Sequence, residues 1–269
     1  MLSKRVLSSV VLVLIMVATL FVDWLCGLMV TAFIIMGLYE FFTILEKKGI
    51  SIYKYFGILM GALIPLSIVF HFQLTKGWEL LLIVLGMVSL MLMQFRRRDS
   101  SGVIVSISTT VFGILYVSWF LSFLIKVRYL EGGLGLFLAV LAITKSGDIG
   151  AYLIGTRFGR HPLMPRVSPK KSVEGAIGGL VFSVLAALAC NSVLKFSYFH
   201  SVTLGIFLGV LAQLGDLSES LMKRDCQVKD SGNILPGMGG VLDLADSVIF
   251  TAPAFYFYMN FVLYKLSIQ

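Results

Sequence analysis

Acidic and basic side chains share one predicted helical face in the second half of this sequence. Asp216, Glu219, Ser220 and Lys223 follow the spacing i, i+3, i+4 and i+7, which places all four on one side of a helix. Two carboxylates on one face suit a hard cation such as Mg²⁺. Arg224 adds a planar donor that can grip a phosphate. The plainer interpretation is a solvated helix end with local ion pairs.

A glycine-rich segment downstream ends in two further aspartates. Gly239 and Gly240 would allow the backbone to approach a phosphate closely. Asp243 and Asp246 lie three residues apart, at the predicted start of the last helix. Capping of that helix explains one aspartate comfortably and two less well.

A lysine and an aspartate also occur inside a predicted membrane span. Lys145 and Asp148 are three residues apart, with Tyr152 one helical turn further on. Charged residues at such positions are costly and by default suggest function. The plainer interpretation is that the two side chains simply pair with each other.

A basic loop follows that span. Five cations lie within it, namely Arg157, Arg160, Arg166, Lys170 and Lys171. Ser172 with Glu174 then opens the next helix, where free backbone N–H groups favour an anion. An ordinary basic loop held against anionic lipid heads is the alternative.

These segments combine carboxylates with cations, and the combination narrows the chemistry. Carboxylates alone would suggest ion transport, and cations alone would suggest lipid-head binding. Together they favour metal-assisted transfer that involves a polyphosphate.

The elements that must position these residues are predicted to be membrane helices. Of the 269 residues, 58% are hydrophobic and only 13% are charged, whereas soluble chains are about a quarter charged. The composition therefore predicts an all-α polytopic membrane protein. The net charge of +8 is typical of the positive-inside bias, so nucleic acid is not an expected partner.

About nine stretches are apolar and long enough to span a bilayer. They are 6–22, 25–45, 55–73, 78–95, 103–125, 134–154, 176–194, 201–217 and 243–264. Most of the Lys and Arg residues lie in the connections on one side of the membrane that these spans would cross. This asymmetry predicts a cytoplasmic N-terminus, and nine spans then place the C-terminus outside.

Two regions follow from that arrangement. Residues 1–102 would form about four apolar helices, and these are apolar filler in the sense that neither they nor their loops would contribute functional residues. Residues 103–269 would form the catalytic region, with cytoplasmic loops near 155–175 and 218–242. A bacterial cytoplasmic (inner) membrane is the expected location.

The second half also resembles a known family, phosphatidate cytidylyltransferase or CDP-diacylglycerol synthase. The resemblance is specific across about 145–250. It rests on Asp148, Tyr152, Ser168, Lys170, Lys171 and Glu174, and on Ser220, Lys223, Arg224, Lys229, Asp230, Pro236, Gly239, Gly240, Asp243 and Asp246. The sequence departs from the family pattern at Met238, where the family has histidine, and at Leu244, where it has arginine.

The resemblance implies that CTP and phosphatidic acid are converted to CDP-diacylglycerol and pyrophosphate with Mg²⁺. Asp216 and Asp243 would bind the metal, with Glu219 and Asp246 nearby, and Asp148 would join them or orient a ligand. The lysines and arginines would grip the phosphates of both substrates. A monovalent cation beside the Mg²⁺ and a homodimer are further implications.

Three alternatives compete with this interpretation. A CTP-dependent kinase of a polyprenol-type lipid alcohol would share the membrane setting and the nucleotide. A transporter would explain intramembrane charges, although transporters usually repeat their polar features in two related halves. An inactive paralogue would explain the two departures from the family pattern.

Overall fold

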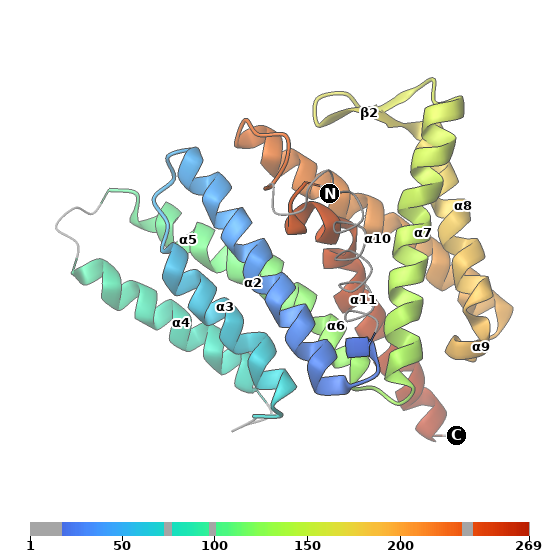
Figure 1. The fold of residues 1–269 in the computed structure, drawn as a ribbon, viewed down its shortest axis with the longest axis horizontal. Coiled ribbons are helices and arrows are strands. Elements are labelled where there is room, and N and C mark those ends of the chain that lie inside the picture. Colours follow the sequence, from blue (N-terminus) through green and yellow to red (C-terminus); the bar gives the residue numbers. More distant parts are fainter. Residues whose placement is uncertain (1–17, 73–76, 97–100, 233–238, 269) are drawn as a thin grey trace, which may run out of the picture.

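The computed structural model describes residues 18–72, 77–96, 101–232 and 239–268, and these form a bundle of helices with one small hairpin (Figure 1). The helices are α2 (Asp23–Lys47), α3 (Lys54–Val69), α4 (Trp78–Phe95), α5 (Val103–Gly113), the π-helical stretch η1 (Ile114–Trp119), α6 (Phe120–Arg128), α7 (Gly133–Phe158), α8 (Val173–Ala189), α9 (Asn191–Leu194), α10 (Tyr198–Asp225) and α11 (Val241–Ile268). Strands β1 (Pro162–Met164) and β2 (Ser168–Ser172) pair antiparallel.

Within the residues that the structure describes, six helices are long and apolar enough to cross a membrane. They are α2, α4, the continuous helix Val103–Arg128, α7, α10 and α11, and α3 and α8 are shorter apolar helices. The exposed side chains of α4, such as Leu80, Val84, Leu85 and Leu92, are large and apolar. Lipid rather than water is the solvent that accepts such a surface, and the chain is an integral membrane protein.

The predicted spans match these helices closely, with two differences in the connections. The first predicted span, 6–22, lies largely outside the described residues, so the total of nine stays a prediction. The predicted loop 218–242 is too long, because α10 continues to Asp225. The predicted loop 155–175 contains the β1–β2 hairpin, which the sequence interpretation did not include.

Several of the predicted cytoplasmic connections lie together at one end of the bundle. Lys48, after α2, forms an ion pair with Asp225 at the end of α10. Arg224 donates from Nε to the carbonyl oxygen of Val167 in the hairpin, at 3.3 Å. Figure 1 shows the hairpin and the ends of α2 and α10 at the top of the view. The polar segments of the sequence therefore converge on one side.

Small residues let the helices of the second half approach closely. A Cβ atom on Gly178 of α8 would lie 2.6 Å from the Cβ atom of Ile154 in α7, and one on Gly150 would lie 2.4 Å from the ring of Phe182. Close backbone approach of this kind is the usual way in which membrane helices pack. It fixes α7 and α8 as one unit beneath the hairpin.

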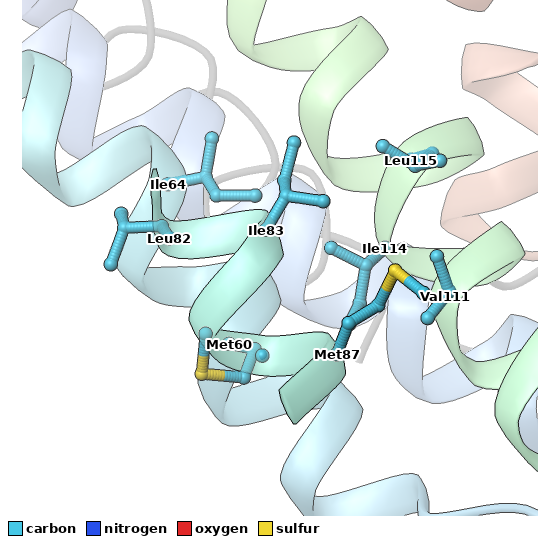
Figure 2. Close-up of a pocket in the computed structure, with 9 residues that line it drawn as sticks. Met60, Ile64, Leu82, Ile83, Met87, Val111, Ile114 and Leu115 are labelled. Carbon is cyan, nitrogen blue, oxygen red and sulfur yellow. The ribbon is translucent and has the colours of Figure 1, made fainter. Parts of the chain in front are cut away.

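The first half contains a small apolar crevice between α3, α4 and the helix that begins with α5 (Figure 2). Its walls are aliphatic side chains and methionines, including Met60, Ile64, Ile83, Met87 and Ile114. This apolar lining does not suit a phosphate or a metal ion. The crevice is therefore a feature of helix packing, and the candidate active site lies in the second half of the chain.

Candidate active site

A polar cleft lies between α7, α8, α10 and the β1–β2 hairpin. It has about 1010 Å³ of empty volume. Six residues singled out from the sequence line it, namely Asp148, Tyr152, Ser168, Lys170, Lys171 and Asp216. The structure thus brings together residues that are far apart in the sequence, and it places cations and carboxylates around one space.

An ion pair connects the hairpin to α10 across this cleft. The Nζ atom of Lys171 lies 2.6 Å from Oδ2 of Asp216, and each side chain is about one-third exposed. Ser172, the next residue, caps α8 by accepting a hydrogen bond of 3.1 Å from the Gly175 amide. The capped helix end positions Lys171 over α10.

The intramembrane pair on α7 is present, and it has a third member. Lys145 Nζ lies 3.0 Å from Asp148 Oδ2. Ser247 of α11 accepts from Lys145 at 2.8 Å and donates to Asp148 Oδ2 at 2.8 Å. Lys145 and Asp148 therefore pair, as the plainer interpretation of the sequence predicted. Ser247 connects this pair to α11, and Asp148 also lines the polar cleft.

Two aspartates of the neighbouring helices face each other beside that cleft. Asp216 of α10 and Asp246 of α11 are close enough for their charges to interact, and Asp148 adds to the same negative region. Gly215 makes the approach possible, because a Cβ atom there would lie 2.4 Å from the carbonyl oxygen of Asp246.

Gly215→Ala is therefore expected to destabilise the fold by about 1–3 kcal/mol, because backbone rather than a flexible side chain blocks the added methyl group. The measurement is the midpoint of thermal unfolding in detergent. Gly86→Ala is the matched control, since its methyl group would meet the flexible end of Met60 at 3.1 Å. Equal midpoints for the two variants would contradict the close α10–α11 contact.

A second charged cluster lies further along the same two helices. Lys223 Nζ is 3.2 Å from Glu219 Oε1 and 2.5 Å from Asp243 Oδ1. Glu219 is only 1% exposed. Among the described residues, neither of its carboxylate oxygens has a hydrogen-bond partner. Lys223 therefore compensates two carboxylates and bridges α10 and α11.

Asp243 also holds the segment that precedes α11. Its Oδ2 atom accepts hydrogen bonds from the Ser231 amide at 2.9 Å, the Ser231 hydroxyl at 2.8 Å and the Gly240 amide at 2.8 Å. Gly239 has φ +87° and packs against the same carboxylate, a conformation that glycine adopts without strain. Both glycines thus shape the backbone around Asp243, in addition to any role toward a phosphate.

Glu40 of α2 belongs to this site and was missed from the sequence. It is 3% exposed and accepts hydrogen bonds from the amides of Val241 and Leu242 at 3.0 and 2.9 Å. The view of residues 1–102 as apolar filler is therefore wrong at this position. The signal was available, because a carboxylate within the predicted span 25–45 is as costly as Lys145 or Asp148.

Glu174 holds the hairpin in this structure, and the substrate-binding role predicted for it stays a prediction. Its carboxylate accepts from the amides of Arg160 and His161 at 3.0 and 3.2 Å, and contacts the His161 ring at 2.6 Å. The Arg160 amide first, and His161 second, lower the pKa of Glu174 to about 2. The carboxylate therefore stays charged below the ordinary pKa of glutamate. Its stabilisation of the hairpin is complete above that ordinary pKa and is lost progressively as the pH falls from there through about 2.

Three other described residues that were predicted to bind substrate do not line the polar cleft. Ser220 is half-buried on α10, and Lys229 and Asp230 are exposed after it. Pro236 and Met238 lie outside the described residues. The roles predicted for all of these side chains stay predictions.

The acidic residues have the type of ligand atom, carboxylate oxygen, that a hard cation binds. Within the described ranges, no group of three or more His, Cys, Asp or Glu side chains is arranged to hold a metal ion. The carboxylate of Glu219 is nevertheless buried with Lys223 as an ion-pair partner and with no hydrogen bond from the described residues, which is a costly arrangement. Asp243 and Asp246 lie within electrostatic reach of it. Carboxylate oxygens are the ligands that Mg²⁺ prefers.

Comparisons with known proteins find similar sequences. A phosphatidate cytidylyltransferase from Synechocystis sp. is 30% identical, with 97% of each chain covered, and one from Thermotoga maritima is 33% identical, with 94% of each covered. Protein YnbB of Escherichia coli is 37% identical over 62% of this chain, which spans 58% of that protein's length. A model of the cytidylyltransferase family matches residues 3–262. Because that match covers nearly the whole sequence, this chain belongs to the cytidylyltransferase family.

Proposed function

We propose that this protein transfers the cytidylyl group of CTP to phosphatidate, which yields CDP-diacylglycerol and pyrophosphate. The observation that carries the proposal is the polar cleft, where the Lys171–Asp216 pair and Asp148 lie near the half-buried Asp246. Cations to hold phosphates and carboxylates to hold a metal are what such a transfer needs. Relatives named for this activity support it.

The reaction requires orientation more than acid–base chemistry. A phosphate oxygen of phosphatidate would attack the α-phosphorus of CTP, and the bond from that phosphorus to the bridging oxygen would break, releasing pyrophosphate. The attacking group is already an anion, so no strong base is needed. The protein must align two anions and offset their repulsion. Lys170 and Lys171 line the cleft, where they would bind the phosphates.

An apolar cavity beside the cleft suits the lipid substrate. It lies between α2, α6, α7 and α11 and has about 1130 Å³ of empty volume. Among its described lining residues, Lys145 is the one charged side chain, and Leu244 is part of the apolar wall. Because Lys145 pairs with Asp148 of the polar cleft, we place the lipid phosphate near this pair, with acyl chains in the cavity. Leu244 then serves the acyl chains, where the family pattern has arginine.

Mg²⁺ would be held by carboxylates from the set Asp216, Asp243, Asp246 and Glu219, and would supply positive charge to the polyphosphate. We place the site at the cytoplasmic face of a bacterial inner membrane, since the basic residues of the sequence concentrate in the connections on that side. A monovalent cation and a homodimer remain predictions.

The test is turnover by the purified protein in detergent with labelled CTP, phosphatidate and Mg²⁺. We expect CDP-diacylglycerol and pyrophosphate in equal amounts, and loss of both when a chelator removes the metal. A second arm replaces phosphatidate with a polyprenol. Release of CDP and a phosphorylated alcohol there, with no product from phosphatidate, would overturn the proposal in favour of a lipid-alcohol kinase.

A further inference from the structure

Glu40 is a charged residue enclosed by the fold in the apolar middle of α2. Its carboxylate accepts hydrogen bonds from the amides of Val241 and Leu242, and it shares the single Ser231 hydroxyl proton, at 3.1 Å, with Asp243. The two amides belong to the first turn of α11, whose N–H groups have no partner within the helix. A side chain from one helix therefore caps another, and its charge also suits the positive end of the α11 dipole.

Two glycines make room for this carboxylate. A Cβ atom on Gly232 would lie 2.5 Å from Oε1 of Glu40, and one on Gly240 would lie 2.4 Å from Oε2. The amides at the start of α11 are thereby occupied by protein carboxylates, so a substrate phosphate does not take them in this arrangement.

The contacts continue from Glu40 to the candidate metal residues. The Ser231 hydroxyl that meets Glu40 also lies 2.8 Å from Asp243 Oδ2, and Asp243 Oδ1 meets Lys223. Lys223 in turn compensates Glu219. A single chain of polar contacts thus runs from the first half of the protein to both carboxylates of the second charged cluster.

We propose that Glu40 is a positioning residue: by capping α11 and holding Ser231, it fixes Asp243 in the orientation that the site requires. It touches neither substrate nor reacting atoms. The inference rests on the proposed function for its activity readout only, because the capping role is measurable without turnover.

The first measurement is hydrogen–deuterium exchange of peptides covering 239–245 in the full-length protein, with Glu40→Gln and Glu40→Asp. Glutamine has only one accepting oxygen, so one of the two amides loses its partner, and we expect exchange there to quicken about tenfold. Aspartate keeps the charge with a shorter reach and should give an intermediate change. Glu46→Gln is the matched control on the same helix, since Glu46 pairs only with Lys54 and its side chain is 46% exposed.

The second measurement is the Mg²⁺ concentration that gives half-maximal turnover. Outer-sphere partners of metal ligands typically affect metal affinity about 10–100-fold, so Glu40→Gln should raise this concentration about tenfold or more. Ser231→Ala should raise it too, because it removes the hydroxyl that joins Glu40 to Asp243. Exchange at Val241 and Leu242 should change less than in Glu40→Gln, since both amides keep Glu40 as their acceptor. A merely structural role would lower thermal stability without moving the Mg²⁺ dependence.

Unchanged exchange in Glu40→Gln and Glu40→Asp would overturn the capping role, and an unchanged Mg²⁺ dependence in Ser231→Ala would overturn the link to Asp243. If Glu40→Gln does not fold, Glu40→Asp decides the first point. An inactive parent protein would count against the proposed function, whereas the exchange result would still decide the role of Glu40.

Discussion

Asp246→Asn is expected to lower kcat by about 10²–10³-fold, the usual cost of losing one charged or polar group that stabilises a transition state. Asp246 lies between α10 and α11, in electrostatic contact with Asp216 and Asp148. The substitution keeps the size of the side chain and removes its negative charge, so metal binding should suffer and packing should not. The measurement is kcat and KM for both substrates over a range of Mg²⁺ concentrations.

Asp225→Asn is the matched control. It makes the same chemical change at the same end of the bundle, on a carboxylate that is 67% exposed and pairs only with Lys48. We expect its turnover to equal that of the parent protein. If Asp246→Asn kept parental turnover at every Mg²⁺ concentration, the assignment of Asp246 to the metal site would be wrong.

Lys223→Met is expected to cause the largest loss of stability. The lysine is 12% exposed and lies between Glu219 and Asp243, which are 1% and 14% exposed. Its removal leaves two carboxylates enclosed without their cation, and breaking a buried ion pair costs about 3–5 kcal/mol. The measurement is the midpoint of thermal unfolding in detergent, with the yield of folded protein as a second observable.

The double variant Lys223→Met with Glu219→Gln should recover part of that loss, because one of the two uncompensated charges is then gone. Lys48→Met provides a surface comparison, since an exposed pair is worth only about 0–1 kcal/mol. If Lys223→Met and Lys48→Met had the same midpoint of thermal unfolding, the buried cluster would contribute no more to stability than a surface ion pair.

Hydropathy alone predicted most of the helices. The predicted span 78–95 coincides with α4, and the break expected near Asp23 is where α2 begins. Apolar length is a local property, so it can be read from a continuous stretch of residues. Family membership was also predictable, because the signature residues lie within about 145–250.

Contacts between distant residues were not predictable in the same way. The spacing of Lys145 and Asp148 predicted their pairing, but Ser247 joins them from α11, 99 residues after Asp148. The hairpin depends on Glu174 reaching back to Arg160 and His161. Helix α10 extends beyond its apolar part because its last turns find partners such as Lys171 for Asp216 and Asp243 for Lys223. A single sequence does not specify such partners.

The cap on α11 has a consequence for how the chain is made. Glu40 enters the bilayer with the second predicted span, yet its partner Val241 follows 201 residues later. At translation rates of about 5–20 residues per second, the carboxylate waits roughly 10–40 seconds before the amides that satisfy it emerge from the ribosome. Until then it must be protonated, hydrated or sheltered by the insertion machinery. The last helix thus supplies the partners of an acid in the first half of the protein, and a chain that stops before residue 241 lacks the amides that Glu40 accepts from.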